Sequence, residues 1–262
     1  MTTISYAAPV TTAPPTQRQK MSPTRKVALV GGLMYLLTFA ASIPQLKLFS
    51  HVINDPEGFV SGHGSTTPVL WGSWFEVITA LSCIGTAVAL YPITRRVSKS
   101  AAIGFVSSRI TEAALIIVGV VSLLTVVTMR TDLAGATGAR GDALRVTGHA
   151  LVQLRQWTFL LGPGVMAGIN GCFLAYVMYK SRLVPRLIPT VGLIGAPLIL
   201  ISSTATIFGL WDQVSGPGAV LTFPIAAWEF SLGLWLTFKG FRHEALTAMG
   251  VSAKRDLNVD AE

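Results

Sequence analysis

Six long blocks of apolar residues, separated by short polar connections, dominate the sequence. Each block is long enough for the helix of about 20 residues that crosses the hydrocarbon core of a bilayer. Runs such as 115–127 do not alternate apolar and polar residues, which disfavours the strands of a membrane β-barrel. The sequence therefore predicts an all-α bundle of six transmembrane helices, at 27–49, 69–93, 102–128, 157–179, 187–210 and 221–239.

The composition agrees with an integral membrane protein. Hydrophobic residues make up 51% of the chain and charged residues 12%, whereas soluble domains carry about a quarter charged residues. The net charge of +8 does not indicate nucleic-acid binding, because the basic residues cluster at the ends of the apolar blocks. We expect a multi-pass protein of the cell membrane whose main partner is the lipid bilayer, with no nucleic acid bound.

The basic residues also predict the topology. They are concentrated before the first block, in the second and fourth connections, and after the sixth block, where Lys and Arg mark the cytoplasmic side. Both termini are therefore expected in the cytoplasm. The long outer connection 130–156 carries several arginines, and its second half places Leu144, Leu151 and Leu154 near one helical face. We expect a short interfacial helix there, lying on the outer membrane surface.

The expected organisation is a disordered cytoplasmic tail at 1–26, a membrane domain at 27–242 and a cytoplasmic tail at 243–262. The first tail is rich in Thr, Pro, Ser and Gln and buries too little apolar surface to order itself. An alternative treats Met21 as a start codon and the first block as a signal peptide, with cleavage near 39–42. That alternative leaves five spans and an extracellular amino terminus.

Ionisable residues inside the spans are the best candidates for function, since a charge near the bilayer centre needs a partner, a proton or water. Four are present: Glu76, Arg109, Glu112 and Glu229. Counted from the outer ends of their spans, Glu76 and Glu229 lie at about 10 Å and 12 Å. Arg109 and Glu112 share one helical face at i, i+3. We predict a polar pocket in the outer half of the membrane that binds or moves a small solute or a proton.

The same four residues have a structural interpretation. They form, in this view, a clamp that fixes helix packing in a structural or assembly subunit, without any ligand. Arg109 could also extend toward the inner headgroups and pair with none of the acids.

A helix break in the fourth span is a second candidate feature. Gly162, Pro163 and Gly164 interrupt backbone hydrogen bonding, and Asn170 follows two turns later. Broken helices that line a cavity are typical of transporter sites, but Gly and Pro are also common packing and kink residues in membrane helices. We therefore assign these four residues to cavity lining as a hypothesis.

Chemical motifs are scarce. No nucleophile and base are suitably spaced, so a membrane-embedded enzyme is the weakest of the three functional hypotheses. The four histidines are scattered and no pair has the i, i+4 spacing of a helical zinc site. His51, His63 and Asp55 could form an outer metal site, although without tight spacing. No metal or cofactor is expected, and Cys83 and Cys172 are read as apolar fillers.

Six segments resemble a known bacterial membrane family, domain of unknown function 4386. They are GLMYLLTFAASIP at 32–44, GTAVALYPITRR at 85–96, SRITEAALIIVGVV at 108–121, WTFLLGPG at 157–164, YKSRLVP at 179–185 and WEFSLGLWLTFKGF at 228–241. The resemblance covers about residues 26 to 242 and implies a multi-pass membrane fold, without implying an activity. Similar chains carry a histidine and an acid before the tryptophan, where this chain has Arg155 and Gln156. That departure counts against a mechanism that needs a histidine there.

Overall fold

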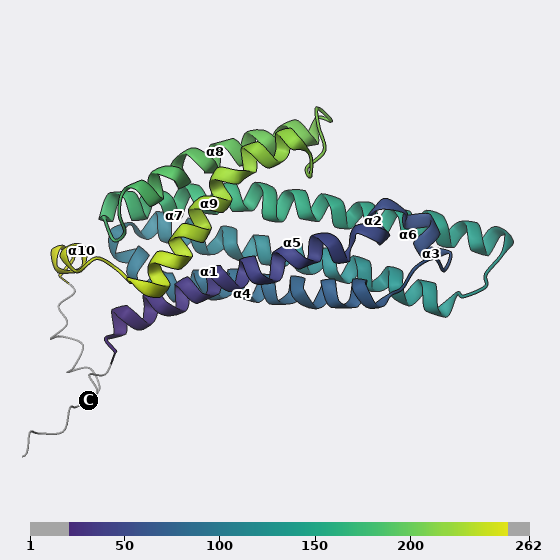
Figure 1. Ribbon diagram of the computed structural model, residues 1–262, viewed down its shortest axis with the longest axis horizontal. Coiled ribbons are helices and arrows are strands. Elements are labelled where there is room, and N and C mark those ends of the chain that lie inside the picture. Colours follow the sequence, from purple (N-terminus) through teal and green to yellow (C-terminus); the bar gives the residue numbers. More distant parts are fainter. Residues whose placement is uncertain (1–20, 251–262) are drawn as a thin grey trace, which may run out of the picture.

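The computed structural model describes residues 21–250, and all regular structure in that range is helical (Figure 1). Six helical stretches are long and apolar enough to cross a membrane, which confirms the predicted six-helix, all-α fold. Residues 1–20 and 251–262, which make up most of the two predicted tails, lie outside the described range. The spanning helices are α1 (Pro23–Leu48), α4 (Thr67–Val97), α5 (Lys99–Asp132), the run Gly138–Ser181, α8 (Leu187–Ile207) and α9 (Gly216–Phe238).

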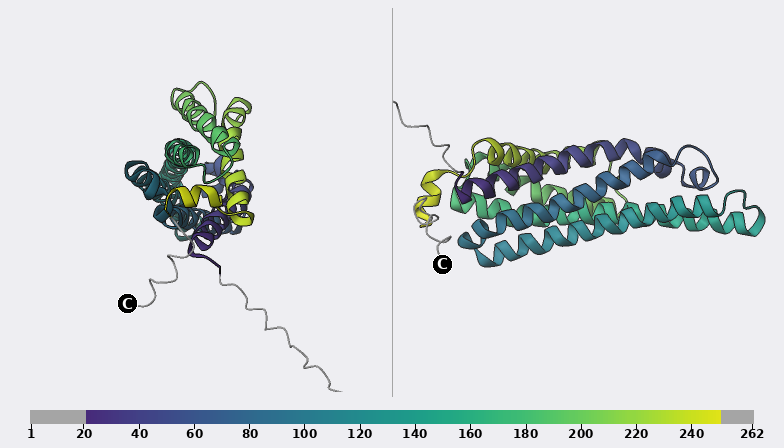
Figure 2. Two further views of the ribbon diagram at one scale, coloured as in Figure 1. Left: turned by 90° about the vertical axis from the view of Figure 1, so that its left-hand side faces the viewer. Right: turned by 90° about the horizontal axis from the view of Figure 1, so that it is seen from below.

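The run Gly138–Ser181 consists of α6 (Gly138–Phe159), the π-helical segment η1 (Leu160–Met166) and α7 (Ala167–Ser181). Three short helices complete the fold: α2 (Ser50–Asn54), α3 (Pro56–Val60) and α10 (His243–Ala248). α10 and the start of α1 lie at one end of the bundle, called here the α10 end (Figures 1 and 2). The turn between α5 and α6 lies at the opposite end, called here the α5–α6 end.

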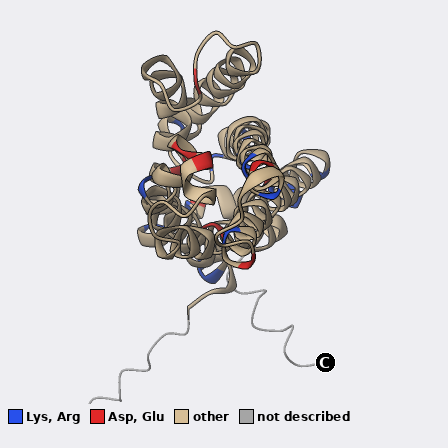
Figure 3. Cartoon of the chain, turned by 90° about the vertical axis from the view of Figure 1, so that its right-hand side faces the viewer, with Lys and Arg blue, Asp and Glu red and all other residues tan. Residues whose placement is uncertain are grey.

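Neighbouring helices in the chain also pack against one another in space. α4 packs between α1 and α5, α8 packs along both α7 and α9, and α9 returns to cross α1. Seen from the α5–α6 end, the ribbon is mostly uncharged, as expected for helices that face lipid (Figure 3). The crossing of α1 and α9 therefore closes the six helices into one bundle.

The predicted short interfacial helix at 142–156 is not confirmed as a separate element. The segment is helical, but it belongs to α6, which continues through η1 into α7. α6 packs along α5 and α3, and together α5 and α6 extend beyond the end of α4 (Figure 1). Burial against α5 explains the difference, because it gives the apolar side of this segment a protein surface to pack against.

Small residues allow α1 to approach its neighbours closely. A Cβ added to Gly32 would lie 2.6 Å from the backbone N of Thr237 and 2.8 Å from the carbonyl of Gly233. One added to Gly31 would lie 2.7 Å from the side chain of Leu90. Without a hydrophobic force between helices in lipid, such close contact is a main source of their association. The α1 crossings with α4 and α9 therefore depend on these glycines.

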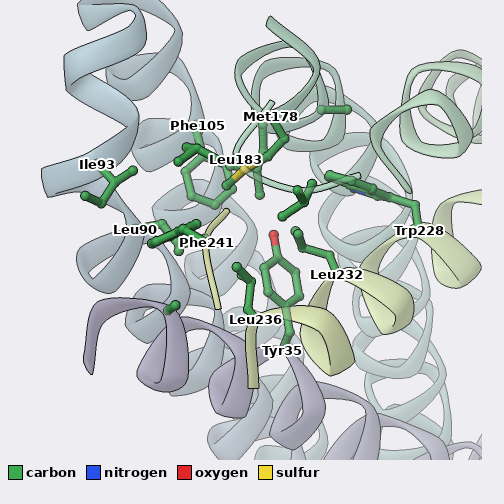
Figure 4. Packing of buried hydrophobic residues seen from close by; sticks show 14 of the residues in the cluster. Tyr35, Leu90, Ile93, Phe105, Met178, Leu183, Trp228, Leu232, Leu236 and Phe241 are labelled. Atoms are coloured by element: carbon green, nitrogen blue, oxygen red, sulfur yellow. The ribbon is translucent and has the colours of Figure 1, made fainter. Parts of the chain in front are cut away.

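The main apolar core lies toward the α10 end. It contains large buried side chains from α1, α4, α5, α7 and α9, including Tyr35, Leu90, Phe105, Met178 and Trp228 (Figure 4). Ala245 and Leu246 of α10 join this core. The predicted tail at 243–262 thus begins with a short helix that packs on the bundle.

A second apolar cluster lies toward the α5–α6 end. Phe49, Val52, Phe59 and Val60 from the end of α1 and from α2 and α3 pack there against α4, α5 and α6. Between the two clusters the helices carry buried charges.

Candidate functional site

Arg109 is the centre of a buried ionic cluster. Its side chain on α5 is 1% exposed, Nη1 donates to Glu112 Oε2 at 3.1 Å, and Nη2 donates to Glu229 Oε1 at 2.5 Å. Glu112 stands three residues after Arg109 on the same helix face, whereas Glu229 is contributed by α9. The structure thus brings together three of the four ionisable residues that the sequence placed in one pocket. We call Arg109, Glu112 and Glu229 the Arg109 site.

Two polar side chains from other helices complete the contacts. Asn170 of α7 donates from Nδ2 to Glu112 Oε2 at 2.7 Å. Arg109 Nη1 also lies 3.5 Å from Cys83 Sγ on α4. Asn170 was predicted to line a cavity near the helix break; in the structure it binds a carboxylate of the ionic cluster. Cys83, predicted as an apolar filler, lies beside the guanidinium.

Aromatic rings cover the Arg109 guanidinium. Its Cζ lies 4.9 Å from the centre of the Tyr35 ring and 5.9 Å from that of Phe105. A cation over a ring face is attracted by the ring quadrupole, more strongly where water is excluded. The guanidinium is therefore held by carboxylates at its edge and by rings at its faces, so the alternative in which Arg109 extends toward headgroups is wrong.

Glu76 belongs to a second site, the Glu76–Arg155 pair. Arg155 Nη2 donates to Glu76 Oε1 at 2.6 Å, and the side chains are 3% and 4% exposed. The Arg155 guanidinium lies 4.4 Å from the centre of the Phe159 ring and 5.0 Å from that of Phe49. Glu76 precedes Cys83 by seven residues on α4, so the two sites stand about 10 Å apart along the bundle.

The sequence missed Arg155 because it treated residues 130–156 as a connection outside the bundle. In the structure, Gly148, Val152 and Arg155 are all buried on one face of α6, while Leu154 is 43% exposed. The spacing of three and four residues was the available signal. Of the predicted apolar face, Leu144 is buried and Leu151 packs against the second apolar cluster, whereas Leu154 faces outward. The prediction was wrong for Arg155, which it placed away from that face and which is buried.

The predicted helix break coincides with η1, where the backbone follows a π-helix. Pro163 has no N–H, so the Phe159 carbonyl cannot form the usual α-helical bond to it, and the i→i+5 pattern of η1 offers it the N–H of Gly164 instead. Gln213 Nε2 donates to that carbonyl at 3.3 Å. A Cβ on Gly162 would lie 3.4 Å from the Glu112 carbonyl, so this glycine lets η1 approach α5 beside the Arg109 site.

Gly164 makes a similar close approach on the other side of η1. An added Cβ would lie 2.9 Å from Ser203 Oγ of α8. Gly162, Pro163 and Gly164 thus shape a packed helix junction next to the site. π-helical turns are frequent at functional sites, and Asn170 lies in the first turns of α7, directly after η1.

No group of three or more His, Cys, Asp or Glu residues within 21–250 is arranged to hold a metal ion. His51 Nε2 lies 3.3 Å from the carbonyl oxygen of His63, so these two residues contact through ring and backbone. Asp55 instead accepts a hydrogen bond from the backbone N–H of Gly58. The alternative of an outer metal site at His51, His63 and Asp55 gains no support from this arrangement.

A family model described as Domain of unknown function (DUF4386) matches residues 30–240. The chain belongs to this family. The match includes the whole of the Arg109 site and the Glu76–Arg155 pair. Comparison with curated proteins and with solved structures finds no match to the chain.

The charges of the two sites in this DUF4386 chain do not balance in the same way. The Glu76–Arg155 pair joins one carboxylate to one guanidinium, whereas the Arg109 site offers two carboxylates to a single guanidinium. With all groups ionised, the Arg109 site therefore carries one surplus negative charge in a region shielded from water. Such a charge is stabilised by a bound proton or another small cation.

Proposed function

We propose that this chain is a multi-pass protein of the cell membrane that binds a proton or a small cationic solute at the Arg109 site and moves it across the bilayer. The observation that carries the proposal is the pairing of Glu112 and Glu229 with one arginine. A buried charge without a counterion costs several kcal/mol, so the surplus carboxylate provides the free energy for binding a cation. A proton is the smallest ligand that removes this charge without displacing Arg109.

Glu229 is the member of the site through which the ligand enters and leaves. Its side chain is 13% exposed, whereas those of Arg109 and Glu112 are 1% and 5% exposed. Glu112 is also bound by Asn170, which fixes its carboxylate. Glu229 has fewer side-chain contacts and is therefore the more accessible of the two carboxylates.

The proposed orientation places the α10 end in the cytoplasm and the α5–α6 end outside. It follows from the basic residues of the connections, since Arg95, Arg96, Lys180 and Arg182 all lie at the α10 end with both described ends of the chain. In this orientation the exposed side of α6 lies at the outer surface.

Proton movement is measured with purified protein in liposomes that contain a pH-sensitive dye, using a potassium diffusion potential as the driving force. We expect wild-type protein to acidify or alkalinise the lumen with the sign of the potential and Glu229→Gln to abolish this flux. Glu57→Gln is the matched control, because Glu57 is an exposed carboxylate of α3 outside both sites. Equal flux in wild type and Glu229→Gln would rule out Glu229 as the carrier of the proton.

The second candidate function is a structural or assembly subunit. It is favoured by one observation: Glu229 joins α9 to α5 and Glu76 joins α4 to α6, so each of these ion pairs ties two helices together. This function requires the fold to depend on the pairs and no cation to exchange. It predicts that Glu229→Gln lowers stability while liposomes with wild-type protein show no flux.

A further inference from the structure

The layer of the bundle around the Glu76–Arg155 pair contains four buried polar atoms that have no hydrogen-bond partner among the described residues. They are Gln45 Oε1, Ser73 Oγ, Glu76 Oε2 and Arg155 Nε. The four residues are each 2–3% exposed. An unsatisfied buried polar atom costs about 1–3 kcal/mol, and more when charged, so four in one place call for a ligand.

The register of α1 against α4 places these atoms together. The two helices run antiparallel, and a Cβ on Gly72 would lie 2.5 Å from the ring of Phe49. Gln45 lies four residues before Phe49 and Glu76 four residues after Gly72, so both stand one turn further toward the α10 end on facing helix surfaces.

The other two residues reach the same layer from either side. Ser73 precedes Glu76 by three residues on the buried face of α4. Arg155 of α6 bonds to Glu76 and lies over the ring of Phe49. The polar atoms thus come from α1, α4 and α6, and their residues lie within about one helical turn of one another along the bundle.

The donors and acceptors identify the ligand. Gln45 Oε1 and Glu76 Oε2 accept hydrogen bonds, Arg155 Nε donates one, and the Ser73 hydroxyl does both. A metal cation would meet the positive charge of Arg155, and an apolar ligand would leave all four atoms unsatisfied. Water donates and accepts in the numbers required, and buried waters bind in this manner to about three polar atoms each.

An apolar layer separates this region from the Arg109 site. Ala80, Cys83, Ala113 and Ile116 form a small buried cluster between α4 and α5. On one side of it Cys83 contacts Arg109, and on the other side Arg155 Cγ would lie 3.5 Å from a Cβ on Gly119. The chain therefore stacks two buried ionic sites on opposite sides of one apolar layer.

We propose that the Glu76–Arg155 layer is a water-binding site and that its waters form the entry station for protons from the α5–α6 end. The water-binding part stands on the unsatisfied atoms alone, and the entry role rests on the proposed function. At the station a hydrated proton adds to Glu76 Oε2, while Oε1 keeps its bond to Arg155. Release of the same proton to water restores the carboxylate.

The water is tested by X-ray footprinting of the full chain in lipid nanodiscs, in which hydroxyl radicals made from bound water modify adjacent side chains. We expect Phe49 to be labelled although it is fully buried, and Met178 to stay unlabelled although methionine is the more reactive residue and is equally buried. The double variant Gln45→Leu with Ser73→Ala should lose the label on Phe49. Gln153→Leu, at an exposed position of α6, should keep it.

The entry role is tested by proton flux in liposomes with the same variants. Gln45→Leu with Ser73→Ala should slow the flux several-fold, and Gln153→Leu should leave it unchanged. An unlabelled Phe49 in wild type overturns the water site. A labelled Phe49 with unchanged flux in the double variant overturns the entry role, and absence of flux from wild type with a labelled Phe49 overturns the proposed function and the entry role but not the water site.

Discussion

The two buried arginines of this bundle have nearly the same surroundings but different charge counts. Arg109 and Arg155 each lie against two aromatic rings and each bond to a carboxylate on another helix. Arg155 has one carboxylate, whereas Arg109 has two. A one-to-one pair is neutral and stabilises the contact of two helices, while a one-to-two cluster needs one further positive charge. The number of partners, more than the residue types, therefore separates a pair that is neutral without a bound proton from a site that needs one.

The largest expected effect comes from removing the shared cation of the unbalanced site. Arg109→Ala leaves two carboxylates in a buried layer, and removal of one partner from a buried charged pair costs about 3–5 kcal/mol. The loss is measured as the change in the unfolding midpoint when the protein in mild detergent is titrated with a denaturing detergent. Arg96→Ala, at an exposed arginine of α4, is the control and should unfold as wild type does. An unchanged unfolding midpoint for Arg109→Ala would show that Arg109 does not stabilise the fold.

The balanced pair should respond less and should be rescued by a second substitution. Arg155→Ala leaves a single carboxylate, with an expected cost of about 2–3 kcal/mol. Adding Glu76→Leu removes that carboxylate, so the double variant should be more stable than Arg155→Ala alone. The same unfolding titration on both single variants and the double variant gives the coupling energy. Strict additivity would show that the two residues act independently.

Neutralising one carboxylate should have different effects in the two sites. Glu229→Gln turns the Arg109 site into a one-to-one pair, so stability should change by less than about 1 kcal/mol. Glu76→Gln leaves Arg155 without a countercharge and should cost about 1–3 kcal/mol. The measurement is the free energy of unfolding of the two variants under the same conditions, which compares the two sites directly. Equal losses would mean that the number of carboxylates at Arg109 has no consequence.

A small effect is also expected at η1, the junction between α6 and α7. Gln213→Leu removes the side-chain donor to the Phe159 carbonyl and should cost about 1 kcal/mol or less. In a Pro163→Ala background the restored N–H serves that carbonyl, and Gln213→Leu should then have little effect. The pair of measurements tests whether Gln213 compensates for the proline. A full loss in both backgrounds would show that it does not.

Sequence patterns could predict the part of the site that depends on distance along the chain. Arg109 and Glu112 share a face because they are three residues apart, and Glu229 meets them because its depth in the membrane matches theirs. Counting from the ends of the apolar blocks put Glu76 at nearly the same depth as Glu229. In the structure Glu76 lies about 10 Å along α4 from Cys83, which contacts Arg109, so Glu76 was assigned to the wrong arginine. Its partner Arg155 could not be recognised as buried, because α6 continues the fourth span far beyond the apolar block that marks it in the sequence.

The six spans were predictable for a simpler reason. Every apolar block long enough to cross a bilayer is helical in the structure, since lipid leaves the backbone no other way to satisfy its hydrogen bonds. The extension formed by α5 and α6 could not be read in this way, because its residues are amphipathic and their burial depends on contact between the two helices. The contact of α2 and α3 with that extension is likewise a property of the fold.

The central claim is that the Arg109 site holds a proton at equilibrium, whereas the neutral Glu76–Arg155 pair does not. Infrared spectroscopy of the protein in nanodiscs across a pH titration detects a protonated carboxyl by its C=O stretch, which shifts in D₂O. We predict a carboxyl band that titrates in wild type, persists in Glu57→Gln and disappears in Glu229→Gln. A band that persists unchanged in Glu229→Gln and Glu112→Gln, or no band at any pH at which wild type stays folded, would contradict the account.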